Sequence, residues 1–351
     1  MTTNPSPSPS PSPSPSGWTA ARPKGPSARH STPSPEGRAR VVFLGSGTFA
    51  VPILERLCDH PGLELVGVVA APDRPAGRGA GLQAVPVAGV ARAHELTLLQ
   101  PERLRAAESI AALLGLRPDL GILADYGQIV PAALLEAIPH GMLNLHPSLL
   151  PRHRGATPIP GAILAGDEQT GVSLFRMDAG LDTGPLIAAD AFPLSGSETT
   201  PGLESQLAGL AAGLVERSIE PWLAGVLIAH AQPAEGVTLT RPLRRADGRL
   251  DPDRPAVELE RQVRAYLGWP GSFFESGAGR VAVLAASMAP EIHAQPGTLV
   301  RDGSGLALAT TAGGLRLDAV LPAGGRAMTG AELLRGRPGL AGTSVGPPVG
   351  R

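Results

Sequence analysis

Short apolar segments alternate with helical patterns between residues 39 and 146, and this alternation restricts the fold more than any other feature. The segments RVVFLG, LELVGVVA, LTLLQP, GILA and GMLNLH are rich in Val, Leu and Ile and are bounded by Gly, Pro or Asp. Stretches such as TFAVPILERLCDH and PAALLEAI, which lie between them, are typical of helices. Continuous apolar strands that alternate with helices predict βαβ units and therefore an α/β domain with a mostly parallel sheet.

The rest of the chain predicts the end of this domain and a second, smaller one. An antiparallel strand pair at 171–178 and 184–194, followed by a long helix at 199–225, closes the first domain. Beyond it, a helix at 256–267 precedes short strands with regular turn signals, a spacing typical of a small β-barrel. The expected boundaries are 39–226 for the α/β domain, 227–241 for a linker and 242–337 for the barrel.

Both ends of the chain have compositions that do not support a packed core. Residues 1–38 open with NPSPSPSPSPSPS, and residues 338–351 are rich in Gly and Pro, so we expect both to be disordered. The first segment lacks the apolar stretch of a secretory signal and the amphipathic pattern of a transit peptide. No apolar run reaches the ~18–20 residues of a membrane span, and Cys58 is the only cysteine. A soluble, cytoplasmic protein without an internal disulfide is expected, with Cys58 as a small core residue.

Charge is distributed unevenly along the chain, although the formal net charge is only −1. Residues 1–40 hold five basic and one acidic residue, residues 41–240 hold 11 and 20, and residues 241–351 hold 14 and 10. The basic final third is therefore the better candidate for contact with a polyanion, and a solvated surface is the alternative.

The segment GSGTFA, from Gly45 to Ala50, matches the dinucleotide-binding fingerprint G-x-G-x-x-A after a strand. The fingerprint also needs an acid at the end of the next strand, about 20 residues on. Here Asp73 comes 28 residues after Gly45 and follows a proline. A tight turn between strand and helix is the interpretation that we favour, with an NAD(P) oxidoreductase as the alternative.

The segment GMLNLHPSLLPRHRG carries the strongest indication of chemistry. Alternate residues of a strand share a face, so Asn144 and His146 lie together at the carboxyl edge, where open α/β sheets hold their sites. Pro147 then stops the strand. Asp182, in the turn GLDTG, is positioned to supply a carboxylate that orients His146, whereas Asp178 is expected to shape the turn. An Asn donor, a His base and an Asp suit acyl transfer to an amine. His146 and His153 have no metal-site spacing, so we expect no metal.

Together, NLHPSLLPRHRGATPI and TGVSLFRMDAGLDTGP resemble the signature of the 10-formyltetrahydrofolate-dependent formyltransferases. The loop PDRPAGRG and the C-terminal segment from PGTLV to ELLRGR resemble the branch of that family that formylates methionyl-tRNA. The likeness runs from about Arg40 to Arg337. It implies a Rossmann-like formyltransferase domain followed by an OB-like β-barrel that binds tRNA.

The resemblance also implies roles for single residues. Asn144, His146 and Asp182 would form the catalytic trio, and strand-edge backbone groups at 124–127 would help to hold the pterin. Formyl transfer from 10-formyltetrahydrofolate to the methionine of initiator methionyl-tRNA, by a monomer, is the implied activity. The residues implied to line the folate site are Ser148, Leu149, Leu150 and Pro151, and those implied to contact tRNA are Arg74 and Arg78.

Some positions depart from the family pattern. Ala80 and Gly81 stand where lysines commonly follow GRG, PAGGRAM replaces the commoner PAGKKAM, and His153 stands where Trp is frequent. Arginines between Arg241 and Arg249 could restore the missing positive charge. A formyltransferase acting on a sugar-nucleotide amine or another small amine is the main alternative, and a non-catalytic tRNA-binding protein is a further one.

Overall fold

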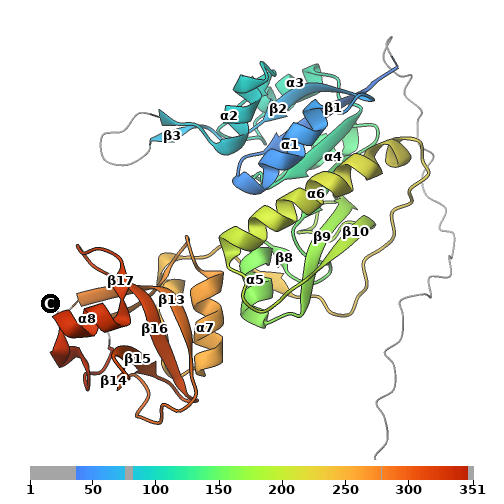
Figure 1. The fold of residues 1–351 in the computed structure, drawn as a ribbon. Helices are drawn as coiled ribbons and strands as arrows, with labels where there is room; N and C mark the ends of the chain where they lie inside the picture. Colours follow the sequence, from blue (N-terminus) through green and yellow to red (C-terminus); the bar gives the residue numbers. More distant parts are fainter. Residues whose placement is uncertain (1–36, 76–81, 278, 347–351) are drawn as a thin grey trace, which may run out of the picture. The chain divides into compact units, whose positions relative to one another are not determined.

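The computed structural model describes residues 37–75, 82–277 and 279–346 (Figure 1). Its first domain contains a seven-stranded sheet with the order β10-β9-β7-β6-β1-β2-β5. The strands from β7 to β5 are parallel, β9 is antiparallel to β7, and β10 is antiparallel to β9. The predicted α/β class and the antiparallel pair are confirmed. The strands are β1 (Ala39–Gly45), β2 (Leu63–Val69), β5 (Leu98–Leu99), β6 (Leu120–Ala124), β7 (Met142–His146), β9 (Gln169–Arg176) and β10 (Leu186–Pro193).

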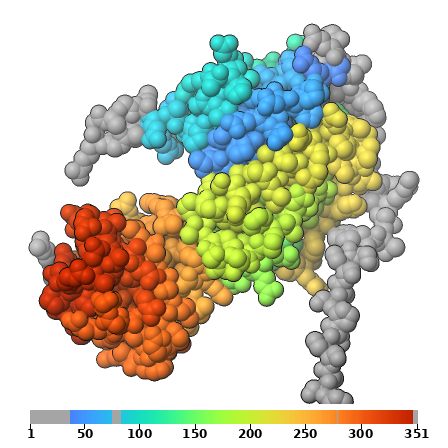
Figure 2. Space-filling view, in the orientation of Figure 1, coloured from blue at the N-terminus to red at the C-terminus, as the bar shows by residue number. Residues whose placement is uncertain are grey.

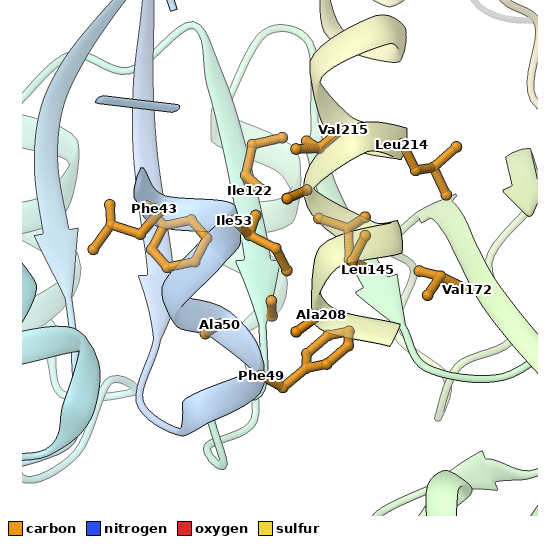
Figure 3. Close-up of a cluster of buried hydrophobic side chains, with 14 of the residues drawn as sticks. Phe43, Phe49, Ala50, Ile53, Ile122, Leu145, Val172, Ala208, Leu214 and Val215 are labelled. Carbon is orange, nitrogen blue, oxygen red and sulfur yellow. The ribbon is translucent and has the colours of Figure 1, made fainter. Parts of the chain in front are cut away.

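Helices cover both faces of this sheet, which explains why its central strands are apolar throughout. Val41 and Phe43 of β1 point into a cluster that includes side chains of α1, α2, α5 and α6, some of which Figure 3 shows. Val42 and Leu44 point into a second cluster with α3 and α4. The helices are α1 (Val51–Cys58), α2 (Pro86–Ala93), α3 (Ala107–Gly115), α4 (Ala132–Ala137), α5 (Pro158–Ala165) and α6 (Thr200–Leu223).

The long helix α6 packs closely because small residues face the core. Ala208, Ala211 and Ala212 are at most 4% exposed and let the helix approach the sheet. At the surface, α1 and α6 are in direct contact (Figure 2). Arg56 of α1 lies 3.3 Å from Glu216 of α6. Apolar area that is removed from water stabilises by about 25 cal/mol per Å², so the buried contacts of α6 with the sheet stabilise this domain more than the surface ion pair does.

The second domain is a curled antiparallel half-barrel with the order β12-β13-β16-β15-β14, and β17 pairs with β16. Leu259 and Val263 of α7 and Leu333 and Leu334 of α8 fill its core. A capping box begins α8, because Thr329 and Glu332 bond to each other's backbone amides at 3.1 and 2.8 Å. The elements are α7 (Ala256–Ala265), β12 (Ser272–Ser276), β13 (Gly279–Ala289), β14 (Leu299–Asp302), β15 (Gly305–Ala309), β16 (Gly314–Pro322), β17 (Met328–Thr329) and α8 (Gly330–Gly336).

The segment expected to be a linker, 227–241, is bound to the first domain along much of its length. His230 exchanges two backbone hydrogen bonds of 2.7 Å with Leu186 of β10. Further on, β11 (Leu239–Thr240) pairs in parallel with β8 (Arg154–Gly155). A segment whose backbone groups pair in this way is held in place as well as joining two domains.

The expectation of a disordered tail is wrong for residues 338–346. Leu340 is 5% exposed in the core of the second domain, and the Val345 amide donates to the Gly297 carbonyl at 2.8 Å. One apolar anchor and backbone pairing therefore outweigh the Gly/Pro composition. Residues 1–36 and 347–351 lie outside the described residues.

The segment that begins with the PDRPAGRG loop contains a short hairpin, in which β3 (Arg74–Pro75) pairs with β4 (Leu82–Gln83). Arg78, which was expected to contact tRNA, lies outside the described residues. No helix in the described ranges is long and apolar enough to cross a membrane. Cys58 lies partly buried at the edge of the first cluster, where burial raises the pKa of its thiol.

Candidate active site

Strand β7 places Asn144 and His146 at the carboxyl edge of the parallel sheet, as the sequence predicts. Leu143 and Leu145 belong to one hydrophobic cluster and Met142 to the other, so the predicted alternation of side chains is confirmed. Asn144 and His146 are buried polar residues, with 7% and 5% of their surface exposed. Buried polar groups need partners, so the contacts of these two side chains indicate what the site can do.

Asp182 is held beside His146 by a tight turn between β9 and β10. Asp178 shapes this turn, as predicted, by accepting from the Gly180 amide at 3.0 Å and the Thr183 hydroxyl at 2.7 Å. Asp182 itself has a φ of 51°, a conformation that Asp adopts more readily than most residues. Its Oδ2 accepts from the Gly155 amide at 2.7 Å and lies 3.7 Å from Nδ1 of His146.

The other nitrogen of His146 faces a carbonyl group, which determines where the ring carries its proton. Nε2 lies 2.9 Å from the backbone oxygen of His153. Because a carbonyl only accepts hydrogen bonds, Nε2 must be protonated, and Nδ1 is then the basic nitrogen of the neutral ring. Burial lowers the pKa of His146, and the charge of Asp182 opposes this shift. The neutral ring can therefore accept a proton at Nδ1 next to a carboxylate that stabilises the cation.

The side-chain amide of Asn144 makes no hydrogen bond to another described residue. Its polar atoms are not fully buried. An amide NH₂ has two donors, which can bond to an oxygen that gains negative charge during a reaction. Asn144 therefore supplies a free donor on the same strand face as His146. The arrangement suits attack on a carbonyl group with proton removal by a neutral base.

The geometry does not favour the dinucleotide alternative. A Cβ atom on Gly47 would lie 1.8 Å from a carboxyl oxygen of Asp125, so an acidic side chain covers the turn that would have to bind a pyrophosphate. Asp73, the candidate ribose ligand, bonds to Gln100 and Arg92 at 2.7 Å each. These two hydrogen bonds lower its pKa and fix the base of the β3–β4 hairpin.

Both domains match known protein-family profiles. The formyl transferase profile matches residues 39–217, and the profile of the formyl transferase C-terminal domain matches residues 242–338. The chain belongs to the formyl transferase family.

Similar proteins agree with this membership. The methionyl-tRNA formyltransferase of Halorhodospira halophila is 45% identical over 301 residues, covering 85% of this chain and 96% of that protein. That of Roseiflexus castenholzii is 42% identical, with the same two coverages.

Among solved structures, the N-formyltransferase from Helicobacter canadensis, in complex with folinic acid and dTDP-3-aminofucose, has a TM-score of 0.58 at 15% identity. The matched region covers 80% of this chain and 98% of that protein. HypX from Aquifex aeolicus with tetrahydrofolic acid has a TM-score of 0.56 at 17% identity, covering 85% of this chain and 47% of that protein. At these identities the likeness concerns the fold.

In this formyl transferase, residues 148–151 form a compact turn after β7. The Ser148 hydroxyl is fully buried and donates to the Arg152 carbonyl at 2.7 Å, while the Ser173 hydroxyl joins Ser148 O and the Leu150 amide. Leu150 is buried, whereas Leu149 and Pro151 remain partly exposed. The turn thus offers apolar surface and backbone groups, and its polar side chains are engaged within it. Its role as the folate site stays a prediction.

Asp125, which the sequence analysis did not single out, lies at the carboxyl edge of β6 beside β7. Its φ is 45°, and its carbonyl accepts from the Ser46 amide at 2.9 Å. Burial of the carboxyl group, with a smaller contribution from the nearby charge of Glu204, raises its pKa to about 6. The residue keeps an exposed face, so a carboxyl group that gains a proton near neutral pH borders the candidate site.

Two further side chains that the sequence did not reveal support the trio. Gln232 donates from Nε2 to the carbonyls of Asp182 and Gly184 at 2.8 Å each, and it accepts from Arg154 at 2.6 Å. Thr238 accepts from the His153 amide at 2.7 Å. Both belong to the segment predicted to be a linker, whose sequence gives no indication that it contacts the site.

Basic residues gather before α7, on the segment that the sequence suggested as a compensating source of charge. Arg241 is paired with Asp247 at 2.7 Å. Arg244 and Arg245 are exposed, and their guanidinium groups form no ion pair with a described acid, although the Arg244 backbone amide donates to Asp247 at 2.6 Å. The Arg245 guanidinium lies 5.9 Å from the ring centre of Trp269, which is 54% exposed. Arg74 of β3 is also exposed, and it forms no ion pair with an acidic side chain among the described residues.

Proposed function

We propose that this formyl transferase moves the formyl group of 10-formyltetrahydrofolate to the α-amino group of methionine on initiator tRNA. The observation that carries the proposal is the convergence of a free Asn144 amide, a neutral His146 and Asp182 at one strand edge. The chain's 45% identity to a methionyl-tRNA formyltransferase across both domains supports tRNA as the acceptor.

The proposed mechanism assigns one task to each member of the trio. The amine attacks the formyl carbon, and the formyl oxygen becomes an oxyanion that the Asn144 amide stabilises. His146 Nδ1 takes the proton that the amine loses, and Asp182 stabilises the resulting imidazolium. When the bond between the formyl carbon and N10 of the folate breaks, His146 returns that proton to N10.

The folate is proposed to lie against the edge formed by residues 124–127 and 148–151. Leu149 and Pro151 supply partly exposed apolar surface for a flat ring system, and the strand ends supply backbone donors and acceptors. Asp125 borders this edge with a carboxyl group whose pKa is raised to about 6, so its protonated form can donate to a ring atom.

The tRNA is proposed to be held by basic side chains from both domains, with the protein acting as a monomer. Arg74 and Arg78 would contact the acceptor end. Arg244 and Arg245 would contact phosphates, and the exposed Trp269 ring offers a surface on which a base or ribose can stack. Each phosphate contact that is lost should lower the slope of log affinity against log salt by about 0.7–0.9.

The test compares charged initiator and elongator Met-tRNA as acceptors with 10-formyltetrahydrofolate as donor. Selective formylation of the initiator is expected, and His146→Ala and Asn144→Ala should each lower kcat at least about 100-fold without loss of folate binding. Folate binding without formylation of either tRNA would contradict the proposal, and dTDP-linked amino sugars would then be tested as acceptors. Near-normal turnover of either variant would refute the assigned roles.

A further inference from the structure

His153 is a buried histidine that the proposed mechanism leaves unused. It is 6% exposed, and its Nε2 lies 2.7 Å from Oδ2 of Asp167. Asp167 follows Gly166, the residue that caps the end of α5. Asp167 also accepts from Arg152 at 2.5 Å through its other oxygen. Because a carboxylate only accepts, the His153 ring must donate from Nε2. A charge-assisted bond of this length in a buried place is strong and directional.

The backbone of His153 has a conformation that requires support. Its φ is 56°, in the left-handed region that residues other than glycine adopt rarely. Three contacts hold it there. The amide donates to Thr238 Oγ1 at 2.7 Å, the ring bonds to Asp167, and the carbonyl accepts from His146 Nε2 at 2.9 Å. The same residue therefore joins a partly buried acid to the ring of the proposed base.

We propose that His153 is a positioning residue: its side chain, anchored by Asp167, fixes the backbone carbonyl that sets the tautomer of His146. The inference rests on the proposed function of His146. When the carbonyl faces Nε2, that nitrogen keeps its proton, and Nδ1 stays basic beside Asp182. If the carbonyl turns away, Nε2 loses its partner, and the ring can then carry its proton on Nδ1. A protonated Nδ1 cannot accept the proton of the amine.

A purely structural role for the pair makes different predictions. Gly161 of α5 is close to the His153 ring, since a Cβ atom there would lie 3.0 Å from Nδ1, so the ring also fills space. If filling space or stability were its only role, losing the ring would lower the melting temperature without changing the His146 tautomer. His153→Gly separates the two roles sharply, because glycine adopts this φ freely but has no ring to anchor.

The experiment measures kcat, KM and the His146 tautomer in a set of variants. In His153→Gly, His153→Ala and Asp167→Ala we expect kcat to fall about 10- to 100-fold with KM changed less than about twofold. His153→Gln and Asp167→Asn keep a donor and an acceptor at these positions and should stay within about fivefold of the unchanged protein. The double variant His153→Ala/Asp167→Ala should be no slower than either single variant, because both remove one interaction.

Two controls and a spectrum complete the design. Arg152→Ala removes the other partner of Asp167, and Asp190→Ala removes an ion pair with Arg217 that has no contact with the trio. Both should retain full activity. Long-range ¹H–¹⁵N spectra of histidine-labelled protein, assigned with His146→Gln, should show Nε2 protonation in the unchanged protein and a tautomer mixture in His153→Ala.

The outcomes that overturn the proposal are distinct from those that overturn the proposed function. His153→Ala or His153→Gly with full kcat, or with His146 still wholly protonated at Nε2, would show that the carbonyl needs no side-chain anchor. The spectra require no substrate, so they test the positioning role even if formylation of Met-tRNA fails. In that case the function is wrong, and the link from Asp167 to the His146 tautomer is still decided.

Discussion

Replacing Asp182 by Asn tests the central electrostatic contact of the site. Its carboxylate lies 3.7 Å from His146 Nδ1, and the two side chains are 13% and 6% exposed, so solvent screens them little. At an effective dielectric constant of about 20, two unit charges at this distance interact by about 4.5 kcal/mol. At about 1.4 kcal/mol for each factor of ten, losing the charge should lower kcat about 10³-fold, and less if the amide dipole compensates.

The assay is single-turnover formylation of initiator Met-tRNA as a function of pH. Transfer needs neutral His146, so the rate rises with pH through the pKa of that ring. Burial lowers this pKa, and Asp182 opposes the shift. Without the carboxylate the midpoint should therefore move to still lower pH, while the plateau falls. Asn can still accept from the Gly155 amide, so the turn should persist.

Asp178→Asn is the matched control, because that carboxylate belongs to the same turn and bonds only within it. Its rate should stay within about twofold. If Asp182→Asn retained more than a tenth of the plateau rate with an unshifted midpoint, Asp182 would not stabilise the imidazolium, and the reasoning from the 3.7 Å contact would be refuted.

Three further outcomes are expected. Asn144→Ala should lower kcat about 10²- to 10³-fold with little change in KM for tRNA. If KM rose by that factor and kcat did not change, Asn144 would act in ground-state binding instead. Asp125→Asn should stabilise the protein at pH 8 by up to about 1 kcal/mol, given its partial exposure, and not at pH 4. Its pKa is raised to about 6, so its contribution to stability is present below about pH 4 and lost as pH rises through 6, which urea unfolding at both pH values checks. Gly184→Ala should destabilise by about 1–3 kcal/mol, because a Cβ would lie 1.9 Å from the Arg176 carbonyl oxygen, and an unchanged urea midpoint would show that the turn can relax.

Much of the site could be predicted because its main signals are local. The period of two along β7 placed Asn144 and His146 on one face, and the apolar character of the strand predicted its burial. The glycines around Asp182 predicted a turn, since a turn depends on the backbone freedom of neighbouring residues. The family pattern of these residues then indicated the chemistry, which the match over residues 39–217 and 242–338 supports.

Other features could not be read from local sequence. The tail at 338–346 has the composition of a disordered segment, and it is ordered because Leu340 is buried in the core of the second domain and Val345 pairs with Gly297. Gln232 stands 50 residues after the Asp182 carbonyl that it holds, in a segment whose pattern is that of a linker. The close approach of Asp125 to Gly47 depends on two strand ends that meet only in the folded sheet.

The sequence by itself determined which side chains gather at the carboxyl edge of the sheet, because strand periodicity and turn chemistry act over a few residues. Only the tertiary structure decided the state of those side chains. The tautomer of His146 depends on the His153 carbonyl, the conformation of His153 depends on Asp167 and Thr238, and the last of these comes from beyond the first domain's final helix. These hydrogen bonds span 7, 14 and 85 residues, and each depends on turns that only the folded chain brings together, so no strand or helix period encodes them.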